Sequence, residues 1–279
     1  MRDSAKRRRL SVWVAGDGIE IGALHNPLTV PATARVRYVD RMPEAELRKH
    51  YPELNAEMFA PVSIIGSAED LSMLGDASVD FVIANHLLEH VEDPVAALKE
   101  FERVLRQRGV LYLALPDMRR TFDRDRDLTT VDHLIEEHRT GSAANRSRHY
   151  LDWALHVDKK DEDHAQALMD SGYSIHFHVW CADTFLDFLV RARQEFALDF
   201  EIAQFAGPET DDDDEFILIL AKGRADTVPL PRGEIGPDPP VGAGAPPEIP
   251  PISDAEPAAS PVARRRGVVA KVRAFLGGC

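Results

Sequence analysis

The fold is decided by residues 80–117, which read DFVIANHLLEHVEDPVAALKEFERVLRQRGVLYLALPD. Residues 81–84 form a short apolar run, as expected for a strand that is buried on both faces of a parallel sheet. Asp93 and Pro94 predict a helix start, because aspartate caps helices and proline is favoured at their first position. We expect Gly109 to end that helix and residues 110–115 to form a second strand. Two strands joined through a helix are parallel, so this stretch predicts one unit of a doubly wound α/β sheet.

The flanking sequence predicts the rest of the sheet. Apolar runs at residues 18–22, 36–40 and 62–65 indicate three earlier strands, with a short helix over 43–50, so four strand–helix steps are expected before residue 118. An amphipathic helix over 184–196 precedes two strands, 200–205 and 216–220, whose spacing predicts an antiparallel hairpin at the sheet edge. The predicted fold class is therefore α/β, a Rossmann-like, doubly wound and mostly parallel sheet of seven strands.

Composition restricts the functional classes. The chain has 279 residues, 44% of them hydrophobic, and no apolar run approaches the 18 residues that a membrane span needs. Its formal charge of −14 argues against nucleic acid as a partner, because backbone phosphates would be repelled. Two cysteines give no disulfide framework, and no apolar core of signal-peptide length follows the basic start. We therefore expect a cytoplasmic protein.

The chain divides into four segments by composition. A basic N-terminal extension, residues 1–17, precedes the main domain, residues 18–222. Within this domain, residues 118–180 hold seven of the eleven histidines and predict an inserted helical lid after strand five, with helices over 130–138 and 146–157. Residues 223–262 contain eleven of the nineteen prolines and predict a disordered linker. The basic segment 263–279 is either a frayed tail or an amphipathic helix that docks weakly on an anionic membrane or an acidic protein.

A nucleotide-type site is predicted at the end of the first two strands. Gly22 stands in the first strand–helix turn, where a small residue lets the backbone approach a ligand. Asp40 follows eighteen residues later at the end of strand two, where a carboxylate accepts hydrogen bonds from ribose hydroxyls. The alternative is structural, with Gly22 an ordinary turn glycine and Asp40 a helix cap.

Four segments resemble the motifs of class I S-adenosylmethionine-dependent methyltransferases, in order and at family spacing: residues 20–23 (EIGA), 38–40 (YVD), 67–71 (SAEDL) and 79–91 (VDFVIANHLLEHV). Three further stretches, residues 20–27, 173–180 and 215–217, resemble bacterial methyltransferase-domain proteins that often accompany glycosyltransferases. The resemblance implies S-adenosylmethionine as the cofactor. It also implies the residues that bind the cofactor, which are Glu20, Gly22, Ala23, Asp40, Ser67, Ala68, Glu69, Asn85 and His86. The sequence departs from the family in its single turn glycine and in Ser67, which stands where an acid is usual.

Catalytic candidates come from residues 173–180, YSIHFHVW. As a strand, this stretch would place His176 and His178 on one face, which could line a pocket, and imidazole can act as a base near neutral pH. Both histidines could instead be structural, or two ligands of a metal completed by the lid; we predict no metal. Asp117, at the end of strand five, is a third catalytic candidate, although helix capping would also explain it.

The predicted function is therefore methyl transfer from S-adenosylmethionine to a small molecule or glycan intermediate, most simply at oxygen. The substrate class rests on the resemblance alone. The first alternative is a non-catalytic, methyltransferase-like binding protein, which the reduced glycine turn favours. The second is a nicotinamide-dependent oxidoreductase, which is disfavoured because a bound pyrophosphate normally needs further glycines.

Overall fold

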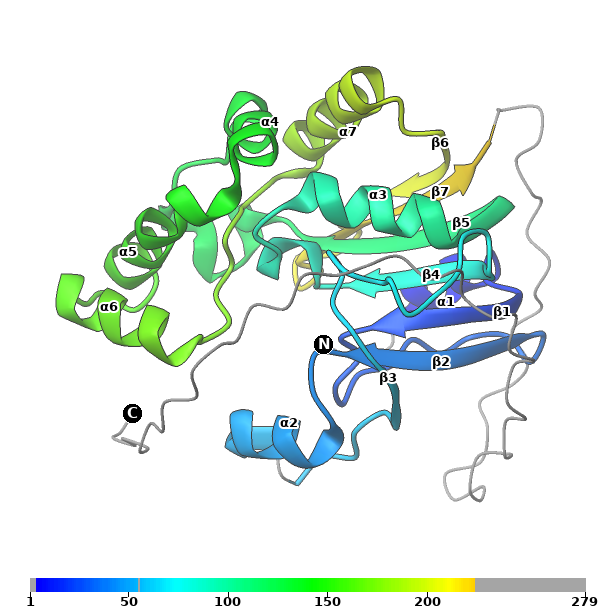
Figure 1. Cartoon of the computed structure of the whole chain (residues 1–279), viewed down its shortest axis with the longest axis horizontal. Helices are drawn as coiled ribbons and strands as arrows, with labels where there is room; N and C mark the ends of the chain where they lie inside the picture. Colours follow the sequence, from blue (N-terminus) through cyan, green and yellow to red (C-terminus); the bar gives the residue numbers. More distant parts are fainter. Residues whose placement is uncertain (1–3, 55, 224–279) are drawn as a thin grey trace, which may run out of the picture. The chain divides into compact units, whose positions relative to one another are not determined.

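The computed structural model of the chain describes residues 4–54 and 56–223. At its centre lies a seven-stranded sheet in the order β3-β2-β1-β4-β5-β7-β6 (Figure 1). The first five strands are parallel, and β7 pairs antiparallel with both β5 and β6. The predicted fold class, with its antiparallel edge hairpin, is confirmed. The strands are β1 (Gly16–Ile21), β2 (Ala34–Asp40), β3 (Val62–Ile65), β4 (Val79–Asn85), β5 (Leu105–Pro116), β6 (Phe200–Ala206) and β7 (Glu215–Lys222).

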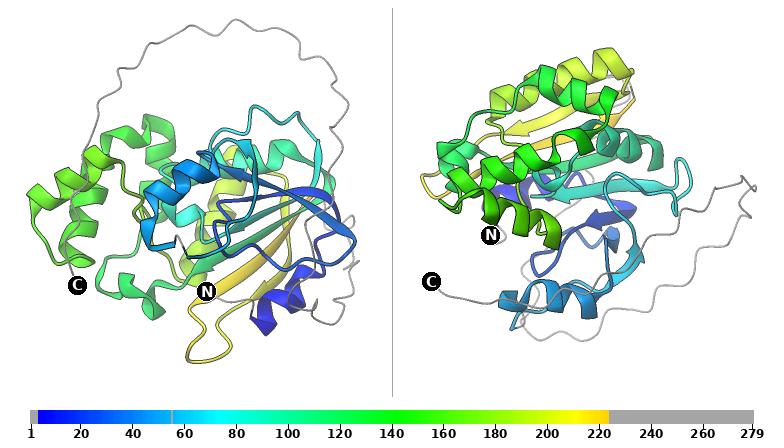
Figure 2. Two further views of the ribbon diagram at one scale, coloured as in Figure 1. Left: turned by 90° about the horizontal axis from the view of Figure 1, so that it is seen from below. Right: turned by 60° about the vertical axis from the view of Figure 1, so that its left-hand side comes forward.

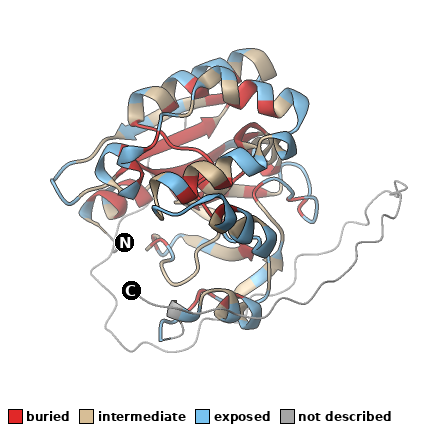
Figure 3. Cartoon of the chain, turned by 90° about the vertical axis from the view of Figure 1, so that its left-hand side faces the viewer, coloured by how far each residue is buried: buried red, intermediate tan, exposed pale blue. Residues whose placement is uncertain are grey.

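Helices cover the two faces of the sheet unequally. One face packs on α3 and α7, with apolar side chains such as Phe101 and Phe188 buried against the strands. The other face is covered by α1 and by the loop between β1 and β2, through Leu10 and Leu28 (Figure 1). Strands β4, β5 and β7 are mostly buried, whereas the edge strands β3 and β6 and the outer sides of the helices are partly exposed (Figure 3). The α-helices are α1 (Ala5–Ser11), α2 (Glu44–His50), α3 (Pro94–Val104), α4 (Val131–Thr140), α5 (Arg146–His156), α6 (Glu162–Ser171) and α7 (Ala182–Phe196).

The prediction of four strand–helix steps is wrong. Helices occur between β2 and β3 and between β4 and β5, but residues 22–33 and 66–78 connect their strands without a helix. In the first of these loops, Pro27 and Pro31 disfavour helix, because proline lacks an N–H and pushes the preceding residue into extended conformation. The first loop instead supplies Leu28 to the core below the sheet.

The helix start at Asp93 and Pro94 is confirmed, because Asp93 Oδ1 accepts a hydrogen bond from Ala96 N at 2.9 Å. The predicted end at Gly109 is wrong. The helix ends at Val104, and Leu105 already has extended backbone and pairs with Val79 of β4. Pairing with β4 satisfies the backbone hydrogen-bonding groups of both strands, so Leu105 adopts strand conformation and the helix does not continue.

Residues 118–180 hold α4, α5 and α6, and lie beyond the carboxyl ends of β4 and β5 (Figures 1 and 2). The helices predicted near 130–138 and 146–157 are present, whereas α6 was not predicted. Short 3-10 helices complete the described elements: η1 (Pro52–Leu54), η2 (Leu88–His90), η3 (Met118–Arg120), η4 (Phe122–Asp125) and η5 (Ser142–Ala144).

The strand predicted over residues 173–180 is wrong. The segment is extended, but its backbone hydrogen bonds go to loops instead of a strand ladder. Phe177 N donates to Glu89 O at 2.7 Å, and Val179 O accepts from Thr129 N at 3.1 Å. Both sides of the segment are therefore covered by protein, and His176 and His178 are buried.

The N-terminal extension predicted over residues 1–17 contains, in its described part, α1 and the first residues of β1. Lys6 and Arg7 of α1 are buried against the β6–β7 hairpin. The predicted linker and C-terminal basic segment lie outside the described residues. Among residues 4–54 and 56–223, no helix is long and apolar enough to span a bilayer.

Candidate functional site

The sheet register brings the predicted cofactor residues to one edge. Ile21 of β1 lies opposite Val39 of β2 and Ala84 of β4, so the next residues along the three strands, Gly22, Asp40 and Asn85, lie side by side. Gly22 N donates to Val39 O at 2.9 Å, and the φ of Gly22 is +68°, a region that glycine adopts at little cost. The glycine therefore permits the turn that ends β1, as its position predicted.

Glu20 lies behind this edge and is fully buried in β1. Its two carboxylate oxygens accept hydrogen bonds from Leu28 N at 3.0 and 3.1 Å, and Asn85 Nδ2 donates to Oε1 at 3.3 Å. Burial raises the pKa of Glu20 to about 7, and the hydrogen bond from Leu28 and the charge of Arg7 only partly oppose this shift. Glu20 therefore holds the loop after β1 in place and has no surface with which to contact a ligand.

The raised pKa of Glu20 predicts a pH-dependent stability. The unfolded chain releases this proton near pH 4.5, whereas the folded chain keeps it until about pH 7. The stabilising difference is complete below pH 4.5 and is lost as the pH rises through 7. At 1.36 kcal/mol per pKa unit, the unchanged protein should lose roughly 3 kcal/mol of unfolding free energy between pH 4.5 and pH 7 through this group. Glu20→Gln has no such proton and should not show this loss. Urea unfolding from pH 4.5 to 8 measures it.

The control is Glu46→Gln, which changes an exposed carboxylate on α2. Its unfolding free energy should follow that of the unchanged protein at every pH. A constant difference between Glu20→Gln and the unchanged protein across this range would contradict the assignment.

Asp40 ends β2 and is mostly buried. Its Oδ1 accepts from Arg41 N at 2.7 Å, and burial raises its pKa although the hydrogen bond from Arg41 lowers it.

The neighbouring loop after β3 forms a tight turn, in which Ser67 N donates to Asp70 O and Asp70 N donates to Ser67 O, both at 3.2 Å. Ala68 is buried in this turn. Glu69 points toward α3, where its Oε1 accepts from Asp93 N at 2.9 Å.

Asn85 and His86 end β4. Asn85 Oδ1 is buried and has no hydrogen-bond partner among the described residues. His86 has a φ of +46°, and its Nε2 donates to Glu215 Oε2 at 3.0 Å. Glu215 also accepts from Arg7, so its pKa falls to about 2, because the hydrogen bonds from His86 and Arg7 outweigh the effect of burial. The end of β4 thus offers one unpaired acceptor at the predicted cofactor edge.

His176 belongs to a cluster beyond the ends of β4 and β5. Its Nδ1 donates to Asp123 Oδ2 at 2.7 Å, and its ring lies edge-on to His90 with centroids 4.6 Å apart. Burial would raise the pKa of Asp123, but the hydrogen bonds and charges of His176 and Arg126 bring it below its usual value. Because an ionised Asp123 holds Nδ1–H, the Nε2 of His176 is left as a proton acceptor. Among the described residues, no partner bonds this atom.

Glu89 and His90 complete this cluster from η2. His90 Nδ1 donates to Ile175 O at 2.9 Å, and burial lowers the pKa of His90 to about 3, with the charge of His176 acting in the same direction. Glu89 is fully buried, and burial raises its pKa to about 7. The backbone oxygen of Glu89 accepts from Phe177 N. These residues therefore fix the loop after β4 against the segment that carries His176.

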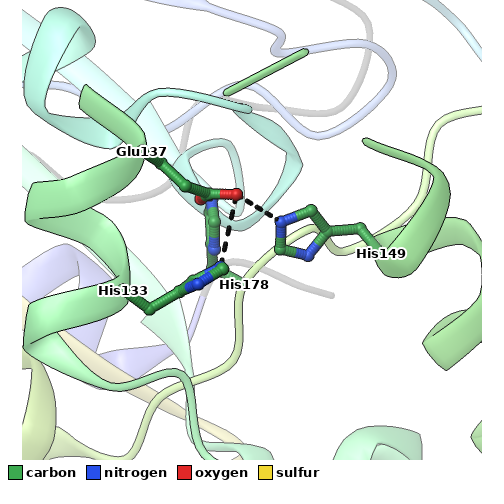
Figure 4. Close-up of side chains that lie close together, drawn as sticks. All are labelled: His133, Glu137, His149 and His178. Carbon is green, nitrogen blue, oxygen red and sulfur yellow. Dashed lines mark hydrogen bonds and ion pairs between the residues drawn. The ribbon is translucent and has the colours of Figure 1, made fainter. Parts of the chain in front are cut away.

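His178 belongs to a different cluster, with His133, Glu137 and His149 (Figure 4). Glu137 Oε1 accepts from His149 Nε2 at 2.8 Å and lies 3.3 Å from His133 Nε2. Burial would raise the pKa of Glu137, but these histidines bring it well below its usual value. Burial also lowers the pKa of His178 to about 3. The two histidines that sequence reasoning grouped thus lie in separate environments.

Asp117 is fully buried at the end of β5. Its Oδ1 accepts from Arg119 N and Nε at 3.1 and 2.8 Å, and its Oδ2 accepts from Arg119 Nη2 at 2.6 Å. Arg120 donates to the carbonyl of Thr210 at 3.0 Å. Asp117 therefore caps η3 and binds an arginine, which is the structural alternative weighed from the sequence.

The edge built from Gly22, Asp40 and Asn85 was predicted, and the structure brings these residues together. Sequence reasoning missed Asp123 as the partner of His176 and missed the cluster around Glu137. One signal for that cluster was present, because His133 and Glu137 are four residues apart within a predicted helix and must share a face. In the sequence, His149 stands next to Tyr150 and four residues before Trp153, which suggests an aromatic group. Tyr150 and Trp153 belong to an apolar cluster with Phe177, and His149 contacts Phe177 as well but also bonds Glu137.

Part of the chain matches a known protein family. Residues 15–113 match the family model described as a methyltransferase domain. Over these residues the chain is similar to a methyltransferase domain. The predicted resemblance and enzyme class, an S-adenosylmethionine-dependent methyltransferase, are confirmed. The matched residues of the methyltransferase domain include Gly22, Asp40 and Asn85, and end within β5. No curated protein matches the chain.

Solved structures resemble the chain more distantly. A methyltransferase from Thermotoga maritima, described as a possible histamine N-methyltransferase, is 18% identical, with a TM-score of 0.40 over 78% of this chain and 91% of its own. A methyltransferase from Methanosarcina mazei is 19% identical, with a TM-score of 0.42 over 79% and 99%. A methyltransferase from Haloferax volcanii, in complex with the Trm112 activator, is 13% identical, with a TM-score of 0.43 over 78% and 90%. These likenesses are too weak to indicate a substrate.

Proposed function

We propose that this methyltransferase domain binds S-adenosylmethionine at the edge formed by β1, β2 and β4, and methylates an oxygen of a small molecule or glycan intermediate with His176 as the base. The observation that carries the proposal is the pair formed by His176 and Asp123, 2.7 Å apart, beyond the ends of β4 and β5. In sheets of this topology, ligands bind outside the carboxyl ends of the strands. The pair therefore lies on the side of the sheet where an acceptor would meet the cofactor.

The residues at the edge fit the chemistry of the cofactor. Asp40 offers carboxylate oxygens to ribose hydroxyls, and Gly22 with Ala23 lets the backbone approach the methionine and ribose part. Asn85 Oδ1, a buried acceptor without a partner, suits a donor group of the ligand. Ser67 and Ala68 would border the adenine, and His86 would line the floor of the site. Two further predicted ligands, Glu20 and Glu69, are assigned supporting roles, because Glu20 is buried beneath the loop and Glu69 bonds to Asp93.

Bound S-adenosylmethionine would supply an electrophilic methyl group. The chain must then orient the acceptor hydroxyl, exclude water and take the hydroxyl proton as the new carbon–oxygen bond forms and the carbon–sulfur bond breaks. His176 Nε2 is suited to accept that proton, because Asp123 fixes the opposite ring nitrogen as a donor. His178 and Asp117 were predicted beside His176 as catalytic residues. We assign them structural roles, since both are fully buried and His178 faces Glu137.

The surroundings of His176 support an acceptor with an apolar face. Phe122 is 54% exposed, and its ring lies 5.0 Å from the imidazole of His176 and 5.6 Å from Trp153, between centroids. An exposed ring next to a base can stack on the carbon face of a sugar or on an aromatic acceptor. The glycan class itself comes from the resemblance to proteins that accompany glycosyltransferases.

Cofactor binding tests the proposal first, by calorimetric titration with S-adenosylmethionine and S-adenosylhomocysteine, and with NADH for comparison. We expect micromolar binding of both sulfur ligands and none of NADH. Binding of NADH alone would instead support the oxidoreductase alternative. Binding of the sulfur ligands without methyl transfer to any acceptor in a glycan and small-molecule screen would favour the non-catalytic alternative.

Asp40→Ala is expected to weaken S-adenosylhomocysteine binding about 10- to 100-fold, because it removes hydrogen bonds from ribose to a carboxylate, each contributing about 1.5–3 kcal/mol. The control is Asp17→Ala, at the opposite end of β1, where the carboxylate pairs with exposed Arg35. Calorimetry should give an unchanged affinity for Asp17→Ala. Equal affinities for the two variants would show that the site has been misplaced.

A further inference from the structure

Three histidines and one glutamate converge in residues 131–178. One side-chain atom from each of four residues, His133, Glu137, His149 and His178, lies within 4.8 Å of the other three. Figure 4 shows the three imidazole rings arranged around the carboxylate of Glu137. We propose that these four side chains bind one divalent transition-metal ion, for which Zn²⁺ is the best candidate, in a closed structural site.

The local structure aims these side chains at one point. His133 and Glu137 are four residues apart on α4, so they project from the same face of that helix. His149 comes from α5, and His178 comes from the extended segment that runs back toward α7. A metal ion here would tie three separate parts of the chain together. A site assembled from distant segments is typical of structural metal centres, which stabilise a fold that its apolar contacts alone hold weakly.

The spacing of the four atoms fits tetrahedral coordination. Zinc binds imidazole nitrogen and carboxylate oxygen at about 2.0–2.2 Å, which places neighbouring ligand atoms of a tetrahedron about 3.4 Å apart. Glu137 Oε1 lies 2.8 Å from His149 Nε2 and 3.3 Å from His133 Nε2, and Glu137 Oε2 lies 3.6 Å from His178 Nε2. These separations scatter around the expected edge of the tetrahedron. Only small shifts of the side chains would be needed to seat the ion.

The burial of this cluster and its polar atoms without hydrogen-bond partners are a second, independent argument for a bound cation. The side chains of Glu137 and His178 are 1% and 0% exposed. Glu137 Oε2 and His178 Nδ1 have no hydrogen-bond partner among the described residues, whereas His178 Nε2 lies 3.3 Å from the backbone oxygen of Glu92. A buried polar atom without a partner costs about 1–3 kcal/mol, so a network of hydrogen bonds alone leaves this cluster unfavourable. A cation at the centre would pair with the carboxylate and with the nitrogen lone pairs together.

The ligand set selects the type of metal. Three imidazoles and one carboxylate suit zinc, iron, copper or nickel, and do not suit calcium or magnesium, which prefer oxygen ligands. Four protein ligands fill a tetrahedral site and leave no position for substrate, which is the pattern of structural zinc. His133, whose side chain is 30% exposed, lies on the side from which an ion can enter. The proposed role is thus to hold α4, α5 and the segment that carries His176.

A second group of possible ligands, Glu89, His90 and His176, is the competing location. It offers three residues, and two of its ring nitrogens bond groups outside it, because His90 Nδ1 bonds Ile175 O and His176 Nδ1 bonds Asp123. The cluster around Glu137 offers four residues, and one of its ring nitrogens, His178 Nε2, bonds a group outside it, the backbone oxygen of Glu92. The cluster around Glu137 is therefore the better candidate, and variants can separate the two.

The first experiment measures metal in the full chain, purified without a polyhistidine tag, by mass spectrometry of the elements. We expect one zinc per chain, removal by EDTA and restoration by added Zn²⁺. At free Zn²⁺ 100-fold above the dissociation constant, the melting temperature of the EDTA-treated chain should rise by about 5–10 °C. A chain that holds no metal after exposure to Zn²⁺, and whose melting temperature Zn²⁺ leaves unchanged, would overturn the proposal.

Variants then locate the ion. Glu137→Gln and His149→Ala should weaken Zn²⁺ binding by more than about 100-fold, beyond the loss caused by removing a supporting residue. The matched control is His156→Ala, two turns later on α5, which pairs with Asp152 outside the cluster and should keep one zinc. Full zinc content in both Glu137→Gln and His149→Ala would contradict the site, as would loss of zinc from His176→Ala alone.

A spectroscopic measurement keeps the proposal testable if these variants do not fold. Co²⁺ is added to the EDTA-treated, unchanged chain, and its visible spectrum is recorded. Four-coordinate Co²⁺ absorbs strongly, and Zn²⁺ should displace it at one equivalent. A weak spectrum of six-coordinate Co²⁺ would show that no closed four-ligand site exists.

Discussion

His176→Ala is expected to lower the rate of methyl transfer about 10²- to 10⁴-fold, the contribution typical of a positioned general base, while S-adenosylhomocysteine binding stays unchanged. The reason is geometric. Asp123 holds one ring nitrogen of His176, so the other can accept the proton of an acceptor hydroxyl. The measurement is S-adenosylhomocysteine release, with the acceptor identified by screening, followed across pH. In the variant the rate should rise with pH, because a hydroxyl that ionises in solution no longer needs the base.

Asp123→Asn gives a second, more conservative test of the same pair. An asparagine can donate to Nδ1 and thereby turn the opposite nitrogen into a donor, which cannot accept the proton. The variant should therefore lose turnover although His176 is present. The matched control is His164→Ala, which removes a histidine that pairs with Asp158 on the surface. Turnover in His176→Ala equal to that of His164→Ala would assign His176 a structural role.

Much of the fold follows from signals that act over a few residues. The cap at Asp93, the proline after it and the apolar runs of β4 and β5 each have a local cause, and all were predicted. The edge formed by Gly22, Asp40 and Asn85 follows from the same signals, because parallel strands end at one side of a sheet. Errors arose where sheet pairing overrides local preference, as at Leu105, which leaves the helix to pair with Val79.

The chemistry beyond this edge depends on contacts distant in sequence. His176 and His178 were expected to share a pocket because alternate residues of a strand share a face. The segment is extended, but protein covers both of its sides, and Asp123 and Glu137 draw the two rings into different clusters. No local pattern indicates those carboxylates as partners, since they lie 53 and 41 residues away.

The burial of Arg7 was missed for the same reason. In the sequence, residues 6–9 (KRRR) suggest a solvated basic start. In the structure, Arg7 Nε and Nη2 donate to Glu215 at 2.9 and 2.6 Å, and the two side chains are 5% and 3% exposed. The antiparallel hairpin, about 200 residues away, supplies the partner for this charge.

Arg7→Ala is expected to reduce the free energy of unfolding by about 3–5 kcal/mol, because it leaves the carboxylate of Glu215 buried with His86 as its remaining hydrogen-bond donor. The control is Arg9→Ala on the same helix. Arg9 pairs with Glu209, and both side chains are about half exposed, so its loss should cost at most about 1 kcal/mol. Urea unfolding at pH 7 measures both variants.

The response to acid separates loss of the ion pair from simple loss of packing. The pKa of Glu215 is lowered from 4.5 to about 2, so its stabilising contribution is complete above pH 4.5 and is lost as the pH falls toward 2. Without Arg7, ionised Glu215 stabilises the fold less, so the unfolding free energy of Arg7→Ala should fall less steeply across this range than that of the unchanged protein.

In the double variant with Glu215→Gln, the two losses of unfolding free energy should not add, because the second change removes the unpaired charge that the first leaves behind. Strictly additive losses with parallel acid profiles would mean that Arg7 stabilises α1 through packing and not through Glu215.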